Sequence, residues 1–378
     1  MQNKRFDELD LSKQVRKAVA DLGFEELTAI QAGSIPLILE GRDVIGQAQT
    51  GTGKTLAFGI PVLERLAVSF KERRLEALVL CPTRELAVQV AEELKRLTKY
   101  RRDVRIVPVY GGQPIQKQLN GLKKGARIVV GTPGRVMDHM NRGTIRLDAL
   151  RMVVLDEADR MLDMGFVDDM KTILWATPED RQTLLFSATM PSSIMDLVNK
   201  FQKDPKVINV SGDQLTVPQV EQTFFEVKPW MKLEVLCRVV DAYDPASSLV
   251  FCNTKRRVDE IVKNLKVRGY HADSLHGDMS QSRRDSAMLR FKSKLSRILV
   301  ATDVAARGLD VTGVEAVINY DLPQDEQCYI HRIGRTARMG RSGKAFTLVL
   351  SGELGRLRDI QEYSKAKIRR QPTPSLRE

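Results

Sequence analysis

The stretch Ala48-Gln49-Thr50-Gly51-Thr52-Gly53-Lys54-Thr55 indicates how this chain folds. A short apolar run at 44–45 precedes it, and apolar residues at helical spacing follow it from Leu56 to Leu66, although Pro61 can kink such a helix. Glycines let backbone N–H groups crowd around an anion, and a helix N-terminus adds positive potential. A strand, a glycine-rich loop and a helix in this order predict a P-loop for phosphate groups.

The last two residues of the loop carry its chemistry. In a P-loop the lysine, here Lys54, reaches the β- and γ-phosphates of a nucleotide, and the hydroxyl residue, here Thr55, ligates Mg²⁺. Ala48 departs from the usual pattern, which begins with glycine. A glycine-rich turn that binds no phosphate is the alternative, but the flanking strand and helix favour the phosphate loop.

Length and composition limit the protein class. A chain of 378 residues is long enough for two domains. No apolar run reaches the roughly 18 residues of a membrane span, and the N-terminus lacks the apolar core of a signal peptide. The four cysteines show no C-x-x-C spacing, so we expect reduced core residues of a cytoplasmic protein. The net charge of +12 fits a polyanionic partner or a basic but inert surface equally well.

The segment upstream of the loop has the residues of a base-binding site. A helical apolar pattern over 9–22 ends at Gly23, and Phe24 and Gln31 follow. A glutamine amide presents both a donor and an acceptor to an adenine edge, and a phenylalanine can stack on the base. The alternative is a core phenylalanine and a surface glutamine.

Downstream of the loop, apolar runs alternate with helical stretches, and each run ends in a polar motif. The runs lie at 77–80, 107–110, 128–130, 153–155 and 184–186. The motifs are Pro82-Thr83-Arg84, Gly111-Gly112, Thr132-Pro133-Gly134-Arg135, Asp156-Glu157-Ala158-Asp159 and Ser187-Ala188-Thr189. Continuous apolar runs predict strands buried on both faces, hence a parallel sheet. Ligands bind at the carboxyl ends of such strands, so we expect all these motifs along one edge.

The acidic motif completes a nucleotide site. Asp156 follows a predicted strand and can hold Mg²⁺, while Glu157 can orient or deprotonate an attacking water. The alternative is an acidic helix N-terminus, which is favourable without any ligand.

A second α/β domain follows. We expect a first domain at 1–208, a linker at the polar, turn-rich residues 209–218, a second domain at 219–369 and a disordered tail at 370–378. The second domain has strand candidates at 223–227, 249–252, 272–275, 298–301, 317–320 and 345–350, but no phosphate loop.

Arginine stands out in this second domain. Arg332, Arg335 and Arg338 recur at three-residue spacing, which predicts one face of a helix. Guanidinium groups suit phosphate oxygens, so these residues can serve as arginine fingers for a nucleotide held elsewhere. A solvated basic face that binds polyanions is the alternative.

These motifs, in this order and spacing, resemble those of the DEAD-box RNA helicases of superfamily 2 over nearly the whole chain. The resemblance covers the Q motif (23–31), motif I (48–55), where Ala48 is the family norm, and the motifs from Ia to VI up to Arg338. Leu27 and Ala29 replace the usual prolines of the Q motif, and Ala337 replaces a common glycine. The resemblance implies an α/β fold of two tandem RecA-like domains. Each would be a mainly parallel sheet flanked by helices, and a flexible linker would join them.

The resemblance also implies a role for each motif residue. The residues implied to bind ATP are Phe24, Gln31, Gln49, Thr50, Gly51, Thr52, Gly53, Lys54, Thr55, Asp310, Arg335 and Arg338. Those implied to act in hydrolysis are Lys54, Asp156, Glu157, Arg335 and Arg338, with Mg²⁺ at Thr55 and Asp156. The implied RNA track is Pro82, Thr83, Arg84, Gly112, Thr132, Gly134, Arg135, Asn253, Thr254, Gly277, Arg284, Thr302 and Asp303. Asp159, Ser187, Thr189 and His331 would couple the nucleotide site to domain closure.

The implied activity is an RNA-dependent ATPase that unwinds short RNA duplexes or remodels RNA–protein complexes when ATP closes two domains on single-stranded RNA. One alternative is an ATP-gated RNA clamp that unwinds little. Another is a superfamily 2 DNA translocase, against which the Q motif and the track residues argue. We expect a monomer without a membrane partner, corresponding either to a minimal helicase core or to the core of a longer protein.

Overall fold

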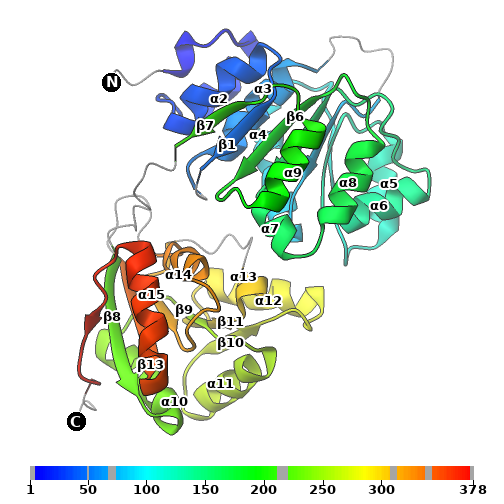
Figure 1. The fold of residues 1–378 in the computed structure, drawn as a ribbon. Helices are drawn as coiled ribbons and strands as arrows, with labels where there is room; N and C mark the ends of the chain where they lie inside the picture. Colours follow the sequence, from blue (N-terminus) through cyan, green and yellow to red (C-terminus); the bar gives the residue numbers. More distant parts are fainter. Residues whose placement is uncertain are drawn as a thin grey trace. The chain divides into compact units, whose positions relative to one another are not determined.

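The computed structural model describes residues 5–48, 51–66, 74–210, 220–306, 313–336 and 343–374. The chain divides into two compact units, Met1–Asp213 and Gln214–Glu378, and each is described by itself (Figure 1). Within these ranges, none of the helices is both long enough and apolar enough to cross a membrane.

The first unit is built on a sheet of seven strands in the order β3-β4-β2-β5-β6-β1-β7, and every pairing is parallel. The strands are β1 (Val44–Gln47), β2 (Ala77–Leu80), β3 (Ile106–Val109), β4 (Ile128–Gly131), β5 (Met152–Asp156), β6 (Gln182–Ser187) and β7 (Lys206–Asn209). The helices are η1 (Phe6–Glu8), α1 (Lys13–Asp21), α2 (Ala29–Leu39), α3 (Lys54–Glu64), α4 (Arg84–Leu97), α5 (Ile115–Lys123), α6 (Pro133–Asn141), α7 (Ala158–Asp163), α8 (Val167–Trp175) and α9 (Ser192–Phe201).

The inner strands bury both faces because successive side chains point to opposite sides of the sheet. In β5, Met152 and Val154 join the core formed with α1 to α4, whereas Val153 and Leu155 join the core formed with α6 to α9. Figure 1 shows α8 and α9 on the side of the sheet opposite α2 and α3. Each fully buried valine or leucine contributes roughly 1.5–3 kcal/mol. The apolar runs therefore form the expected parallel strands.

The second unit repeats this plan with seven parallel strands in the order β10-β11-β9-β12-β13-β8-β14. The strands are β8 (Val220–Val227), β9 (Ser248–Phe251), β10 (Ala272–Leu275), β11 (Ile298–Ala301), β12 (Ala316–Asn319), β13 (Gly343–Leu350) and β14 (Arg369–Arg370). The helices are η2 (Pro229–Met231), α10 (Lys232–Tyr243), α11 (Lys255–Val267), α12 (Gln281–Lys292), α13 (Asp303–Ala306), α14 (Glu326–Ile333), η3 (Ser351–Glu353) and α15 (Leu354–Ser364). α10 and α11 pack on one face, and α12 to α15 pack on the other.

Two expected boundaries differ from the structure. Asn209, which we placed in the linker, is the last residue of β7 and pairs with Gln47. Arg370, which we placed in a disordered tail, lies in β14 beside the long strand β8. The N–H of Gln371 donates to the carbonyl of Phe224, so these tail residues belong to the edge of the sheet. Most of the expected linker, residues 211–218, lies outside the described residues.

The first helix also starts later than its apolar pattern predicts. Leu9 and Leu11 are buried but precede α1, which begins at Lys13 after the N-cap residue Ser12. The Ser12 hydroxyl accepts a bond from the N–H of Val15 at 3.4 Å, which defines the helix start. The four cysteines are buried, as expected, and none of them forms a disulfide bond.

Candidate nucleotide and nucleic-acid sites

The order of strands in the first sheet gathers three sequence motifs. Strands β5, β6 and β1 are neighbours, and their carboxyl ends lead into Asp156-Glu157, Ser187-Ala188-Thr189 and the glycine-rich loop, respectively. Since the strands are parallel, these ends share one edge of the sheet. The remaining motifs follow β2, β4 and β3, which form the other half of the same edge. The sheet thus separates a nucleotide half from a predicted RNA half.

The glycine-rich loop has the backbone of a phosphate site. Gly51 and Gly53 have φ values of 88° and 89°, in the left-handed region that glycine tolerates best. Gly53 caps the N-terminus of α3, and Lys54 is the first helical residue. The Lys54 side chain is buried, and its Nζ donates to the carbonyl of Ala48 at 3.1 Å. The ammonium group is therefore held within the loop; Gln49 and Thr50 lie outside the described residues.

Gln31 is bound to this loop rather than exposed. Its side chain is 3% exposed, its Oε1 accepts from the N–H of Thr28 at 2.9 Å, and its Nε2 donates to the carbonyl of Gly53 at 3.0 Å. A Cβ at Gly53 would overlap this amide. The alternative of a surface glutamine is therefore wrong, whereas a contact with adenine through the remaining N–H and lone pair stays a prediction.

Phe24 has the exposure that a stacking platform needs. Its side chain is 43% exposed, which also excludes the alternative of a core phenylalanine. The ring lies 6.4 Å from that of Phe6, which is buried, so Phe6 supports Phe24 from behind. One ring face can therefore receive a base.

Asp156 ends β5 in an environment that favours its neutral form. Burial raises the pKa of its carboxyl group to about 7, the charge of Glu157 adds to this rise, and the ammonium group of Lys54 opposes it. Its Oδ1 is buried and has no hydrogen-bond partner among the described residues. An unpaired buried carboxylate oxygen needs a cation or a proton.

This donor set fits Mg²⁺. The ion prefers oxygen ligands, is held by one or two carboxylates or hydroxyls, and keeps waters or substrate phosphates as its other ligands. Asp156, at the end of β5, and Thr55, in the first turn of α3 after β1, could supply such oxygens; β6 lies between the two strands. Over the described ranges, no group of three or more His, Cys, Asp or Glu side chains could hold a metal by itself. Phosphates and waters would have to complete the coordination.

Glu157 is held in a strained and specific position. It caps α7 with a φ of 52°, a left-handed conformation that non-glycine residues seldom adopt. Its Oε2 accepts from Nη1 of Arg160 at 2.8 Å, and both side chains are 5% exposed. Sequence reasoning did not single out Arg160, although its position three residues after Glu157 is a usable signal.

Asp159 joins the acidic motif to the loop after β6. Its Oδ2 accepts from the N–H groups of Ala188 and Thr189 at 3.2 and 3.0 Å, and from the Thr189 hydroxyl at 3.1 Å. Its own N–H donates to the Ser187 hydroxyl at 3.2 Å. The structure therefore brings together Asp159, Ser187 and Thr189, three of the four predicted coupling residues. The fourth, His331, lies in the second unit on α14.

The predicted RNA residues of the first unit are of two kinds. Arg84 extends over the paired glycines, so a Cβ at Gly112 (φ 82°) would overlap its guanidinium group. Gly134 is exposed and Arg135 is partly exposed, both in the first turn of α6. These residues can offer contacts at the surface.

The other predicted residues of this half offer little side-chain surface. Pro82, Thr83 and Thr132 are buried, and the Thr83 hydroxyl accepts from the N–H of Leu86 as the cap of α4. Their role in RNA binding stays a prediction. With these side chains buried, we expect them to shape the loops and to offer RNA mainly backbone groups.

In the second unit, Arg332 is the centre of a polar network. Its Nε and Nη2 donate to the two carboxylate oxygens of Asp303 at 2.6 and 2.7 Å. Nη2 also donates to Oδ1 of Asn253 at 3.1 Å, and Nη1 donates to the carbonyl of Asp321 at 2.6 Å. The side chain is 1% exposed, and its guanidinium lies 5.0 Å from the ring centre of Phe251.

This network corrects the predicted arginine face. The helix α14 ends at Ile333, so Arg335 follows it in a turn and is 5% exposed, and Arg338 lies outside the described residues, as does Asp310. Gly334 is the C-cap residue, and the helix stops there. Because Arg332 is buried and paired, a solvated basic helix face is wrong as well.

The network also contains two of the predicted RNA residues of this unit, whose role in RNA binding stays a prediction. The carboxylate of Asp303 and the amide of Asn253 are engaged by Arg332, so Asp303 positions this arginine rather than presenting a free carboxylate. The Thr254 hydroxyl accepts from the N–H of Arg257 as the cap of α11. Thr302 follows β11, Gly277 lies just after β10, and Arg284 lies in the first turn of α12. Asp303, His331 and Arg335 line one small hollow.

Comparisons with known proteins show the family of this chain. Residues 28–197 match the family described as DEAD/DEAH box helicase, and residues 231–340 match the helicase conserved C-terminal domain. The DEAD-box ATP-dependent RNA helicase CshA of Geobacillus kaustophilus is 51% identical over 373 residues, which cover 99% of this chain and 79% of that protein. This chain belongs to the DEAD-box helicase family.

Solved structures of the family share the fold. S. cerevisiae Dbp5 bound to RNA and ADP BeF3 matches 98% of this chain and 96% of its own with 32% identity and a TM-score of 0.86. A DEAD box protein from the hyperthermophile Methanococcus jannaschii matches 97% of this chain and 99% of its own with 43% identity and a TM-score of 0.55. The two units are therefore tandem RecA-like domains.

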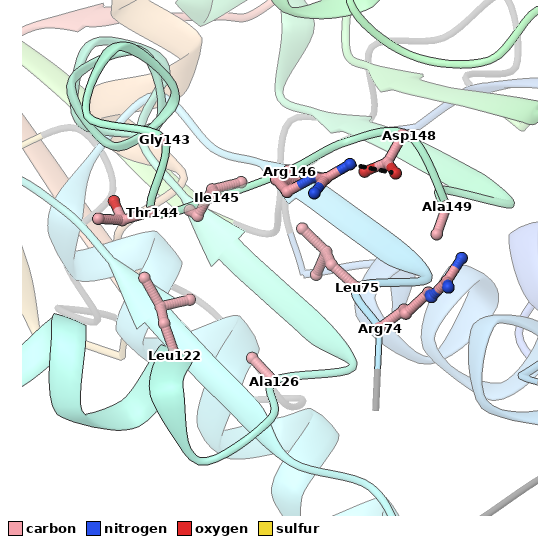
Figure 2. A pocket seen from close by; sticks show the side chains of 10 residues that line it. All are labelled: Arg74, Leu75, Leu122, Ala126, Gly143, Thr144, Ile145, Arg146, Asp148 and Ala149. Atoms are coloured by element: carbon pink, nitrogen blue, oxygen red, sulfur yellow. Dashed lines mark hydrogen bonds and ion pairs between the residues drawn. The ribbon is translucent and has the colours of Figure 1, made fainter. Parts of the chain in front are cut away.

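One hollow of this helicase lies apart from every motif. The hollow has a volume of about 460 Å³, and Arg146 and Asp148, two of its lining residues, form an ion pair at 3.1 Å. Figure 2 shows Leu75, Leu122 and Ile145 among the side chains that line it. Its lining residues precede β2, β4 and β5, so it sits at the amino edge of the sheet, opposite the motif edge. It is not part of the nucleotide site.

Proposed function

We propose that this helicase hydrolyses ATP in response to single-stranded RNA and uses domain closure to melt short RNA duplexes or to remodel RNA–protein complexes. The observation that carries the proposal is the placement of Asp156, Glu157, the Asp159–Thr189 network and the loop of Lys54 at the carboxyl ends of three consecutive strands, β5, β6 and β1. Family membership and a similar protein whose structure holds RNA and ADP BeF3 support it.

Different residues of the chain would bind the phosphates, orient the attacking water, hold the metal and stabilise the transition state. Lys54 binds the β- and γ-phosphates, while the N–H groups of the loop and the N-terminus of α3 stabilise the anion. Glu157 orients the attacking water and accepts its proton. Asp156 and Thr55 would hold Mg²⁺, which when bound neutralises charge on the phosphates. Arg335 and Arg338 would come from the second domain to stabilise the charge of the transition state.

RNA recognition is proposed to be independent of sequence. Contacts from Arg84, Gly112, Gly134 and Arg135 would reach phosphates and 2′-hydroxyl groups, which distinguish RNA from DNA without reading bases. The first turn of α6 would bend the bound strand so that it cannot stay paired. Each lost stacking step costs on the order of 1–2 kcal/mol, with DNA as a proxy, so one closure melts only a few base pairs.

The test is ATP hydrolysis with single-stranded RNA, with DNA of the same sequence and with neither. Wild type and Glu157→Gln are compared. We expect stimulation by RNA only, and its loss in the variant. Equal rates under all three conditions would refute RNA coupling, and equal stimulation by DNA would favour a translocase.

A duplex assay then separates unwinding from clamping. Short RNA duplexes should be separated with ATP, whereas long ones should resist. Stable ATP-dependent retention of RNA without strand separation would instead identify a clamp. The cytoplasmic location and the monomeric state expected from the sequence remain predictions.

A further inference from the structure

Arg160 is the one basic residue within the first helical turns after the acidic motif, and it is buried. It lies in α7, is 4% exposed, and donates from Nη1 to Oε2 of Glu157 at 2.8 Å. Buried ion pairs are costly to desolvate, and hydrophobic residues of similar volume often replace them without loss of stability. Stability alone therefore does not explain why Arg160 forms a buried ion pair with the proposed catalytic carboxylate.

The geometry ties the carboxylate to a rigid element. Arg160 donates its backbone N–H to the carbonyl of Glu157 at 3.0 Å, in the turn that opens α7. The guanidinium group is planar, so a bond to it fixes direction as well as distance. Glu157 is thus held by both its backbone turn and its side chain.

Arg160 also touches the coupling network. Its backbone N–H lies 3.0 Å from Oδ1 of Asp159, whose Oδ2 binds the loop at Ala188 and Thr189. One residue therefore contacts both the proposed catalytic carboxylate, through its side chain, and the coupling carboxylate, through its main chain. Movement of the loop after β6 would displace Asp159, and with it the start of α7 and the bond to Glu157.

We propose that Arg160 is a positioning residue that orients Glu157 for the attacking water and links this orientation to the Asp159–Thr189 network. The inference rests on the proposed ATP hydrolysis and adds a residue that transmits the state of the coupling loop to the reacting water. Arg160 does not touch the substrate; it acts through Glu157.

The chain offers a matched control for a purely structural pair. Arg127 is 3% exposed and donates to Glu76 at 2.7 Å and to Asp103 at 2.6 Å. It precedes β4 and therefore lies at the amino edge of the sheet, away from the motifs. Arg127→Met removes a buried guanidinium without touching Glu157.

The experiment measures RNA-stimulated ATP hydrolysis of the full chain for wild type, Arg160→Met, Arg160→Lys and Arg127→Met, with thermal melting of each. We expect Arg160→Met to lower kcat about 10- to 100-fold while the KM for ATP changes less than about threefold, because the lost interaction orients the attacking water rather than binding ATP. The kcat of Arg160→Lys should lie between those of wild type and Arg160→Met, and Arg127→Met should keep the wild-type kcat.

A double-mutant cycle tests whether Arg160 acts through Glu157. In the Glu157→Gln background, single-turnover rates should change less than about twofold on adding Arg160→Met. Equal losses in both backgrounds, or a kcat for Arg160→Met no lower than that of Arg127→Met, would overturn the proposal. If Arg160→Met fails to fold, unchanged kcat in Arg160→Lys overturns it instead. Absence of RNA-stimulated hydrolysis in wild type would refute the proposed function itself.

Discussion

Replacement of Gln31 by alanine should weaken binding of every nucleotide, whatever its base. The amide supports the phosphate loop through the bond from Nε2 to the Gly53 carbonyl at 3.0 Å and holds the N-terminus of α2 through Thr28. A residue that only recognised adenine would not affect the binding of GTP. Gln31→Ala removes both bonds and leaves a gap beside Gly53, so the loop loses a fixed neighbour.

The expected loss of nucleotide affinity can be estimated from the hydrogen bond between Gln31 and Gly53. A hydrogen bond of this kind contributes about 0.5–1.5 kcal/mol net, and the one to Gly53 bears directly on the loop. If that bond is lost only from the nucleotide-competent loop, affinity falls about 2- to 13-fold for ADP and GDP alike, since 1.4 kcal/mol is about tenfold. Any adenine contact adds a further loss for ADP only.

The assay is equilibrium titration with ADP and GDP. Gln182→Ala is the control, because Gln182 is also buried and its Nε2 donates to the carbonyls of Ile38 and Arg42. Gln182 is the first residue of β6 and so lies at the opposite edge of the sheet. We expect nucleotide affinity to be retained in this control. A variant Gln31→Ala that loses ADP affinity and keeps wild-type GDP affinity would refute a role in supporting the loop.

Two further predictions concern stability. The folded-state pKa of Asp156 is raised to about 7, so the folded chain binds this proton more tightly than the unfolded chain, and stability is lost as pH rises from about 4 to about 7. At pH 8 the buried carboxylate is charged, so Asp156→Asn should be more stable than wild type by a few kcal/mol, at about 1.4 kcal/mol per pKa unit. At pH 4 the two proteins should melt at similar temperatures. Thermal scans at both pH values check this, and an equal difference in melting temperature at both would contradict it. Arg332→Met leaves Asp303 and Asn253 without their partner, so amide hydrogen exchange should show the second domain destabilised by about 2–4 kcal/mol, less than for a fully buried pair because Asp303 is partly exposed. Loss of protection in the first domain instead would contradict this assignment.

Much of the fold was readable from the sequence because its signals are local. The run Met152–Asp156 is apolar until its last residue, and this pattern requires a strand buried on both faces with a carboxylate at its end. The glycines at 51 and 53 indicated a tight loop in the same direct way, and the structure shows both in the left-handed region. Such patterns depend only on neighbours along the chain.

Arg332 shows where local reasoning fails. Three arginines at equal spacing predicted one helical face, but α14 ends at Ile333, and Arg332 is buried against Asp303 and Asn253 from distant parts of the sequence. The pairing of Arg160 with Glu157 went unnoticed for a related reason. Whether a charged residue faces solvent or a carboxylate depends on which elements cover it.

The sequence by itself determined the strands, the phosphate loop and the identity of the acidic motif, since hydrophobic runs and glycine positions act over a few residues. The tertiary structure alone decided the strand order β5-β6-β1, and with it that Asp159 meets Thr189 and that Gln31 supports Gly53. Strand order results from the packing of helices on both faces of a sheet, which no short stretch of sequence contains. The physical reason is that contacts between residues far apart in the chain depend on the packing of the whole domain.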